Sequence, residues 1–197
     1  MTTTSRAPAH AGRPRDAVAD RAITAAAFAL LQEEGYRGLS MEAVAARAGV
    51  AKTTIYRRYA SKRELVVGAL IAETRIEPPA AGIDPREGMR GLVRQGVRML
   101  IGAGAMRILA AFLVEEAREP ELMAIFRARL LEPRRALLLG LLRSGVERGE
   151  VRADADLDLV SEMVLGAVLA HHVRGAEPPD DAWVDALVTT LWAAIRP

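Results

Sequence analysis

The sequence predicts an all-α protein, and three observations support this fold class. The chain has 197 residues, of which 51% are hydrophobic and 26% charged, so it has enough apolar surface to bury a core. Ala, Leu, Val and Arg dominate, whereas aromatic residues make up only 4%. Alanine and straight-chain residues lose little conformational freedom in a helix. Apolar and polar residues nowhere alternate over more than a few positions, so no strand is predicted.

The composition excludes several kinds of site and address. Cysteine is absent, which excludes a disulfide scaffold, a thiolate nucleophile and a Cys-zinc site. The longest uncharged runs, such as residues 163–173, hold 11 residues, fewer than the ~20 that a membrane-spanning helix needs. The N-terminal residues lack the apolar segment of a secretory signal. We therefore expect a protein of the reducing cytoplasm with no membrane partner.

A three-helix domain of the helix-turn-helix type, followed by a fourth helix, is expected over residues 16–76, and a flexible arm over residues 1–15 precedes it. Glycine follows the first and the second of these helices, where it favours the left-handed conformation that ends a helix. Ser40 is a favourable N-cap for the second helix, and Ser61 with Glu64 forms a capping box at the start of the fourth. The expected helices span residues 16–34, 41–48, 52–59 and a stretch that opens at 61 and ends before 78.

A linker rich in proline and glycine, EPPAAGID over residues 77–84, marks the boundary of a second helical domain, residues 77–197. Asp84 caps its first helix, with proline at the first helical position and glutamate at the third. Pro133 is expected to separate or kink two helices, and aspartates cap the last two. The expected helices span residues 85–101, 105–118, 121–132, 134–148, 156–174 and 180–195.

Charge is distributed unevenly along the chain. Residues 1–63 contain 11 Lys and Arg against 5 Asp and Glu, a balance of +6, whereas residues 64–197 contain 16 against 20, a balance of −4. A basic first third on an acidic remainder predicts contact with a polyanion such as nucleic acid. Chance variation between short stretches is the alternative interpretation of charge alone.

Residues 40–59 combine a short helix, a tight turn and a second short helix. Ala45 is small where the two helices must approach each other, and Gly49 can adopt the positive φ that a sharp turn requires. Val50 and Ile55 supply an apolar wedge between the helices. This pattern predicts a helix-turn-helix, whose second helix can enter a major groove about 12 Å wide. An ordinary pair of solvated helices is the alternative.

The second helix of this motif offers hydrogen-bond donors and cations with little apolar content, which suits phosphates and base edges. Lys62 lies in the first turn of the next helix, where the helix dipole disfavours a cation. A nearby phosphate would explain its position. The residues predicted to contact DNA from these two helices are Lys52, Thr53, Thr54, Tyr56, Arg57, Arg58 and Lys62.

The segment ITAAAFALLQEEGYRGLSMEAVAARAGVAKTTIYRRYASKREL, residues 23–65, resembles the N-terminal domain of the TetR/AcrR family of transcriptional regulators without a gap. The residues that match the family pattern are Ile23, Ala26, Ala27, Leu31, Gly35, Tyr36, Ser40, Val44, Ala45, Gly49, Val50, Thr54, Ile55, Tyr56, Ser61, Lys62 and Leu65. The resemblance implies that Tyr56 and Lys62 hold phosphates with help from Ser40 and Lys52, and that Thr53, Thr54 and Arg57 lie toward base edges.

Two departures from the family pattern concern the second helix of the motif. Ala51 stands where the family usually has serine or threonine, which removes the N-cap of that helix at a cost of roughly 1 kcal/mol. Thr53 replaces a frequent glycine where DNA approaches closely, so contacts in the groove are expected to differ there. Neither departure removes the basic face.

A single helix-turn-helix makes few contacts, so specific binding is expected from a homodimer that reads two half-sites about 34 Å apart. The last two helices carry apolar stripes that could form a four-helix bundle between two copies, an arrangement known in the family. Packing of both stripes on their own domain is the alternative. The residues predicted for the dimer interface are Leu157, Val160, Val164, Val168, Trp183, Leu187 and Leu191.

Methionine and leucine are frequent between the linker and residue 148, and methionine suits adaptable pockets. The resemblance implies a cavity for a small-molecule effector, whose identity the sequence does not specify, and plain core is the alternative. The residues predicted for this pocket are Met89, Val93, Met99, Leu109, Phe112, Leu113, Met123 and Phe126.

No catalytic residue, metal site or cofactor is expected. Asp154, Asp156 and Asp158 imitate the start of a calcium loop, but the required glycine and glutamate are missing. No nucleophile elbow or phosphate loop occurs. We therefore predict a DNA-binding transcriptional regulator, a ligand-responsive repressor that binds a palindromic operator in double-stranded DNA as a homodimer, and not an enzyme. The alternative is a helical small-molecule-binding or scaffold protein with a vestigial DNA-binding head.

Overall fold

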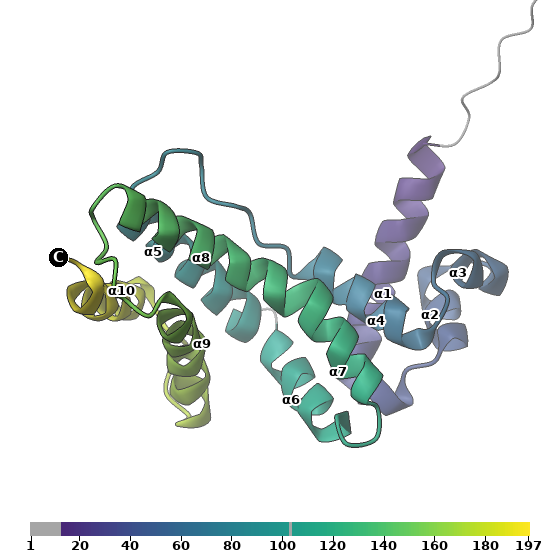
Figure 1. Cartoon of the computed structure of the whole chain (residues 1–197). Helices are drawn as coiled ribbons and strands as arrows, with labels where there is room; N and C mark the ends of the chain where they lie inside the picture. Colours follow the sequence, from purple (N-terminus) through teal and green to yellow (C-terminus); the bar gives the residue numbers. More distant parts are fainter. Residues whose placement is uncertain (1–12, 103) are drawn as a thin grey trace, which may run out of the picture. The chain divides into compact units, whose positions relative to one another are not determined.

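A computed structural model describes residues 13–102 and 104–197, and the regular elements of that part of the chain are all helices (Figure 1). The predicted all-α fold is therefore confirmed. Most of the arm expected over residues 1–15 lies outside the described residues, and the first helix begins at Arg13. The helices are α1 (Arg13–Gly38), α2 (Met41–Ala48), α3 (Lys52–Arg58), α4 (Lys62–Glu73), α5 (Pro85–Val97), α6 (Ala105–Glu115), α7 (Pro120–Phe126), α8 (Glu132–Glu147), α9 (Leu157–Val173) and α10 (Asp181–Ile195).

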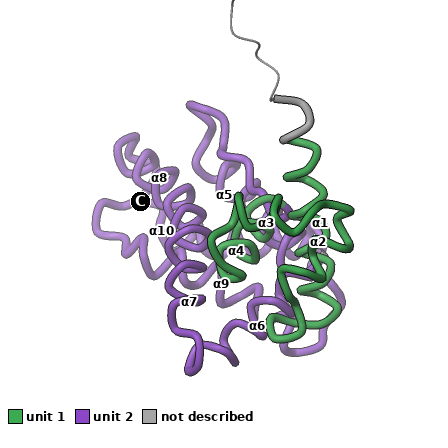
Figure 2. The backbone as a smooth tube through the Cα atoms, turned by 90° about the vertical axis from the view of Figure 1, so that its right-hand side faces the viewer, with its two compact units in different colours: residues 1–72 green, residues 73–197 purple. Residues whose placement is uncertain are grey.

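The chain forms two compact units, and the boundary between them along the sequence lies between Ala72 and Glu73 (Figure 2). Unit 1 holds α1 to α3 and nearly all of α4, and unit 2 holds α5 to α10. The Pro- and Gly-rich segment 77–84 lies within unit 2.

The core of unit 1 is an apolar layer between α1, α2 and α3. Helix α1 packs against α2, and α2 packs against α3. Ile23, Ala27 and Leu31 are four residues apart, so they share one face of α1, and all three are buried. Val44 of α2 and Ile55 of α3 are completely buried in the same unit. The apolar wedge predicted between the two short helices therefore includes Ile55.

The turn between α2 and α3 depends on a left-handed residue. Gly49 has φ 65° and ψ 31° and caps the C-terminus of α2. The next amide, that of Val50, donates to the carbonyl of Ala45 at 3.0 Å, which closes the turn back onto the helix. The positive φ predicted at Gly49 is confirmed. Gly35 also leaves helical geometry where the first helix was predicted to end, with φ 70° and ψ −178°.

Unit 2 is built around α5. In Figure 1, α5 and α8 lie side by side and run in opposite directions, and α5 also packs against α10. Helix α8 contacts α9, and α6 contacts α7. Phe112 of α6 and Phe126 of α7 meet edge to face with ring centroids 5.2 Å apart, and both are buried. These contacts form the apolar core of unit 2.

A ladder of polar contacts joins α5 to α10. Three arginines of α5 are spaced four residues apart, which places them on one face, and they bond to three side chains of α10 with the same spacing. Each contact is partly exposed and adds little to stability, so the main effect of the ladder is to set the register of the two helices. The contacts are Arg86 to Thr189 at 3.0 Å, Arg90 to Asp185 at 2.5 Å and Arg94 to Asp181 at 2.7 Å.

Two predicted helices are interrupted by segments of wider π-helix. Arg98–Gly102 follows α5, and Arg127–Leu131 follows α7. The second segment leads directly into α8, in whose first turn Pro133 lies, and the backbone on both sides of the segment stays helical. The two helices predicted on either side of this proline are therefore joined through the π-helical segment and are not separated. No single helix of the described residues is long and apolar enough to span a bilayer. The stretches Pro85–Ile101 and Ala105–Glu115 reach that length only as a pair bent by 72°.

The predicted aspartate caps are present at three helix starts in unit 2. In each case the carboxylate accepts a hydrogen bond from the backbone amide three residues later, which satisfies a donor that the helix leaves unpaired. At α4, Ser61 accepts in the same way from the amide of Glu64 at 3.2 Å. The aspartate caps are Asp84 to Glu87 at 3.0 Å, Asp156 to Leu159 at 2.9 Å and Asp180 to Trp183 at 2.8 Å.

Gly49→Ala is expected to lower the free energy of unfolding by about 1–2 kcal/mol, because alanine is strained in the left-handed region. No atom lies near the added methyl group to offset this strain. Gly140→Ala is the matched control, since Gly140 lies in α8 facing open space. It is expected to raise the free energy of unfolding by about 0.5–1 kcal/mol. Urea unfolding followed by circular dichroism measures both, and a shift of the same sign in the two variants would contradict strain at Gly49.

Ala51→Ser is expected to raise the free energy of unfolding by about 1 kcal/mol, because a hydroxyl at this position can accept from an unpaired amide of α3. Ala51 already has the extended backbone of an N-cap, with φ −67° and ψ 143°, and makes no side-chain cap. The same unfolding experiment tests it, with Ala46→Ser on the exposed face of α2 as the control, where serine gains no cap. An unchanged midpoint for Ala51→Ser contradicts the missing-cap interpretation.

Candidate nucleic-acid interface

Helix α2 presents its N-terminus at the start of the helix-turn-helix. Ser40 is half-buried, and its Oγ accepts from the backbone amide of Ala43 at 3.1 Å. The first amides of a helix lack an acceptor one turn earlier in the chain, and such groups favour anions; that of Glu42 bonds to its own carboxylate. Glu42 is the acidic residue of this first turn and is exposed. Of the predicted contact residues, Ser40 therefore lies beside a helix end that can accept a phosphate.

Helix α3 has a buried side and an exposed side. Ile55 points into the core of unit 1 and is completely buried. Four of the predicted contact residues lie on the other side of α3, where a large donor such as the Tyr56 phenol is 54% exposed. Thr54 is half-buried between the two sides. The exposed residues of this face are Lys52, Thr53, Tyr56 and Arg57.

Arg58 corrects one sequence prediction. Its Nε lies 2.5 Å from a carboxylate oxygen of Asp20 in α1, and its side chain is only 14% exposed. Its Nη1 also donates to the carbonyl of Thr54 at 3.3 Å. Arg58 follows Ile55 by three residues, so it shares the inward side of α3. This guanidinium attaches α3 to α1 and is not available as a DNA contact in this conformation.

Arg47 makes a second attachment to α1. Its two Nη atoms lie 2.5 and 2.7 Å from the carboxylate oxygens of Glu33, a bidentate ion pair. These hydrogen bonds hold the pKa of Glu33 below its ordinary value and raise the pKa of Arg47. Arg57, by contrast, makes no hydrogen bond or ion pair with any described side chain. The cations of the motif are thus divided between structural contacts and a solvent-facing group.

Lys62 lies at the first position of α4 and is half-buried. Its Nζ donates to the carbonyl of Arg37 at 3.3 Å and lies 4.4 Å from the centre of the Tyr36 ring. The ring face attracts the cation, which explains a lysine at a helix start without reference to a ligand. An ammonium group has three donors, so this placement is compatible with a phosphate contact.

Tyr56 has a partner that the sequence analysis missed. Its hydroxyl donates to Oε1 of Glu42 at 2.9 Å, which links α3 to the first turn of α2. The bond lowers the pKa of Glu42 and raises the pKa of Tyr56. Glu42 is the sole acidic residue within residues 40–59, and this isolation in a basic segment is the signal that could have drawn attention to it.

The predicted dimer residues divide between core and surface. Val160, Val168 and Leu191 are buried within the chain, because they pack against its own helices. This burial corrects their assignment to an intermolecular interface. Trp183 is half-buried, and its ring lies 4.9 Å from that of His171 in the same unit. The other predicted residues, Leu157, Val164 and Leu187, are half-buried.

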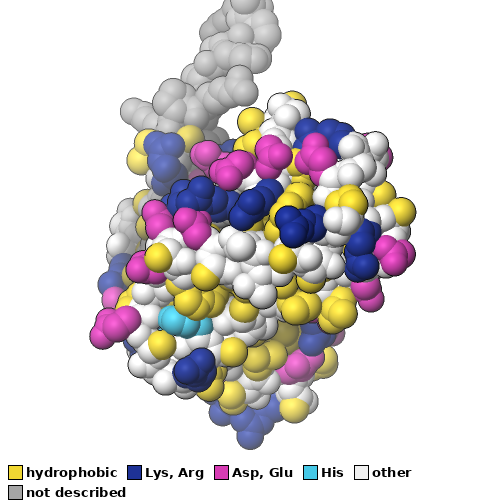
Figure 3. Space-filling view, turned by 90° about the vertical axis from the view of Figure 1, so that its left-hand side faces the viewer, with side chains coloured by type: hydrophobic (Ala, Val, Ile, Leu, Met, Phe, Trp, Pro, Cys, Tyr) yellow, Lys and Arg dark blue, Asp and Glu magenta, His cyan; other side chains and the backbone are white. Residues whose placement is uncertain are grey.

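The exposed apolar residues of α9 form a stripe of their own, next to the predicted dimer residues of that helix. Figure 3 shows the side of the chain on which Figure 1 draws α9 and α10. On this surface, hydrophobic side chains lie next to the histidines. Met163 is 47% exposed, and exposed positions recur from it at steps of three and four residues, which is one face of a helix. The exposed residues of this stripe are Leu159, Met163, Gly166, Ala170 and Val173.

Most residues predicted for the ligand pocket form the core of unit 2. Leu113 is exposed on the surface of α6, so it does not line an enclosed site either. The sequence could not separate a filled core from a cavity, because both need the same apolar residues. The predicted pocket residues that are buried in the core are Met89, Val93, Leu109, Phe112, Met123 and Phe126.

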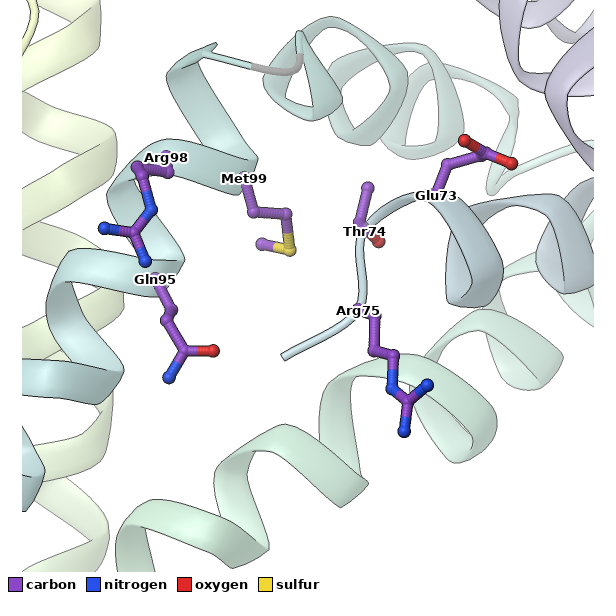
Figure 4. A pocket seen from close by; sticks show the side chains of 6 residues that line it. All are labelled: Glu73, Thr74, Arg75, Gln95, Arg98 and Met99. Atoms are coloured by element: carbon purple, nitrogen blue, oxygen red, sulfur yellow. The ribbon is translucent and has the colours of Figure 1, made fainter. Parts of the chain in front are cut away.

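A pocket of about 210 Å³ lies instead beside the segment that follows α4 (Figure 4). Of the predicted pocket residues, Met99 lines it, and in Figure 4 its thioether points into the space between Gln95 and Thr74. Polar and charged side chains make up the rest of the lining. The lining residues are Glu73, Thr74, Arg75, Gln95, Arg98 and Met99.

Two side chains of unit 2 hold this segment in place. The amide of Gln95 accepts from the backbone N–H of Glu77 at 2.7 Å and donates to its carbonyl at 3.2 Å. Arg134 of α8 donates to the carbonyl of Thr74 and, at 2.7 Å, to its hydroxyl. Burial lowers the pKa of Arg134 to about 10. These hydrogen bonds hold the segment 74–77 in place, and the start of this segment forms one wall of the pocket.

Two family models match this chain. The model of bacterial regulatory proteins of the tetR family matches residues 23–69, which contain the helix-turn-helix. The model described as the tetracyclin repressor-like C-terminal domain matches residues 78–191, more than half of the chain. Together they span both compact units.

Relatives and a solved structure agree with these matches. The chain is 35% identical over 170 residues to the uncharacterized HTH-type transcriptional regulator Rv1556 of Mycobacterium tuberculosis, covering 84% of this chain and 82% of the relative. It is 32% identical over 184 residues to the DNA-binding transcriptional repressor TetR of Mycobacteroides abscessus, covering 89% and 93%. The crystal structure of the TetR family transcription regulator SCO0332 superposes with a TM-score of 0.68 at 31% identity, covering 91% of this chain and 99% of the other. The chain therefore belongs to the TetR family and is a DNA-binding regulator of transcription.

Proposed function

We propose that this regulator is a repressor that binds a palindromic operator as a homodimer and releases it when a small-molecule effector binds. The observation that carries the proposal is the two-sided α3. Ile55 and Arg58 fix its inner side to the rest of unit 1, whereas its outer side offers exposed donors and cations. A helix that reads a major groove needs both features, a rigid mounting and a free polar face.

The contact roles follow from the chemistry of the exposed side chains. Arginine can bond two acceptors of guanine, and threonine suits several base edges, whereas tyrosine and lysine suit phosphates. Arg58 is left out, because Asp20 holds it. We assign Thr53, Thr54 and Arg57 to base edges, and Ser40, Lys52, Tyr56 and Lys62 to phosphates.

We place the dimer interface on the exposed apolar stripe of α9, together with small residues of α10. Ala182, Ala186 and Ala193 are exposed on α10, and small side chains let helices approach closely. Dimer formation is typical of the family, and a pair of α9–α10 hairpins can form a four-helix bundle with twofold symmetry. Such symmetry matches two half-sites about 34 Å apart on DNA.

We place the effector in the pocket lined by Met99. Regulators of the family typically bind small-molecule effectors. The volume of about 210 Å³ and the polar lining favour a small polar molecule with an acceptor for Arg98. The effector acts through its different affinities for the DNA-bound and free conformations. On this proposal the protein works beside chromosomal DNA in the cytoplasm and catalyses no reaction.

Arg57→Ala is expected to weaken operator binding about tenfold or more and to relax the preference at one base pair of each half-site, because a bidentate contact to guanine is lost. Arg58→Ala is the matched control on the inner side of α3. It is expected to lower the free energy of unfolding by up to about 1 kcal/mol and to leave the base preference unchanged. Fluorescence anisotropy with the DNA upstream of the gene measures affinity, and urea unfolding measures stability.

The wild-type affinity is also expected to fall with salt, with a log–log slope of about −0.9 for each phosphate contacted. If both arginine variants bind like the wild type and the salt dependence is flat, the head is vestigial and the proposal is wrong.

Met163→Glu is expected to convert the dimer into a monomer and to weaken operator binding, because it places a charge in the apolar stripe of α9. Val114→Glu is the matched control, since Val114 is 72% exposed on α6. Sedimentation equilibrium gives the mass of each variant. A dimer that survives Met163→Glu but dissociates with Val114→Glu would place the interface on α6 instead.

A further inference from the structure

We propose that Glu42 restrains DNA binding by holding the hydroxyl proton of Tyr56, and so sets the affinity of the head for any duplex. The inference rests on the proposed phosphate contact of Tyr56. In the free chain, that hydroxyl donates to Oε1 of Glu42 at 2.9 Å, although both side chains are exposed and could turn to solvent. Glu42 is thus a positioning residue for Tyr56.

The restraint follows from the count of hydrogen-bond donors. A phenol has one O–H, and both a carboxylate and a phosphate are acceptors only. Tyr56 therefore cannot donate to Glu42 and to a phosphate with the same proton. The contact with DNA requires that the hydrogen bond to the carboxylate breaks and one to the phosphate forms. The gain on binding is only the difference between two charge-assisted hydrogen bonds.

The charge of Glu42 acts in the same direction. It is the sole carboxylate of residues 40–59, and its attraction to Lys52 contributes to its lowered pKa. Arg47 and Arg58 are already paired with acids of α1. A phosphate at the Tyr56 hydroxyl would lie close to this carboxylate, and like charges across an interface are unfavourable. Glu42 thus reduces binding to duplex DNA of every sequence.

A purely structural role for Glu42 predicts different behaviour. An acid in the first turn of α2 interacts favourably with the helix dipole. If this were its whole role, removing its charge would loosen the head and weaken DNA binding. The two roles therefore predict opposite signs for the change in affinity.

The test compares Glu42→Gln, Tyr56→Phe and the double variant by fluorescence anisotropy on an operator duplex and on a scrambled duplex of the same length. Glu42→Gln is expected to tighten binding to both duplexes by about threefold to tenfold, since glutamine is neutral and keeps an acceptor for Tyr56. In the Tyr56→Phe background the gain is expected to fall by half or more, because the competition for the proton is gone. Glu34→Gln, on the exposed face of α1 in the same unit, is the control for net charge and is expected to change affinity by less than about twofold.

Three results would overturn the inference. One is weaker binding by Glu42→Gln, whether or not urea unfolding shows a lower free energy of unfolding, which assigns Glu42 a supporting role. Another is an equal gain from Glu34→Gln, or an undiminished gain in the Tyr56→Phe background, which reduces the effect to general charge. The third is a changed preference at one base pair, which makes Glu42 a reader of cytosine. Failure of the proposed function is distinguishable, because Arg57→Ala then has no effect on binding either.

Discussion

The closed turn at Gly49 is the constraint on which the rest of the DNA-binding unit depends. Its left-handed backbone and the hydrogen bond from Val50 to Ala45 set the direction in which α3 leaves α2. Burial of Ile55 then fixes the rotation of α3 about its own axis. Once direction and rotation are set, the outward positions of this short helix are determined, and they carry the donors and cations assigned to DNA.

Neighbouring arginines on α3 show how one helix separates support from contact. Arg58 turns inward to Asp20 and attaches α3 to α1, whereas Arg57 faces solvent without a described partner. Glu42 adds a third element, because it engages the Tyr56 hydroxyl before DNA arrives. Because Arg58 already holds α3 against α1, less conformational entropy is lost when α3 binds DNA. The Glu42 carboxylate, on the inference above, reduces the electrostatic attraction between this segment and the phosphates. The balance between them fits the proposed function, in which the protein leaves DNA when an effector binds.

Features that depend on a few adjacent residues could be predicted from the sequence. The caps at Asp84, Asp156 and Asp180 and the positive φ at Gly49 are local, since each concerns one turn of chain. Features that depend on which side of a helix meets another helix could not. An arginine next to another arginine does not reveal that Asp20 of a distant helix will pair with one of them. In the same way, apolar residues of α9 and of the core of unit 2 follow one helical period, and only packing separates the buried from the exposed.

The most direct test of this account is hydrogen–deuterium exchange of the whole chain with and without an operator duplex at low salt. Exchange is expected to slow on DNA binding in peptides covering residues 40–62, with little change in α6 and α7. Slowed exchange confined to unit 2, with the α2–α3 segment unchanged, would contradict the claim that the exposed face of α3 is what meets the duplex.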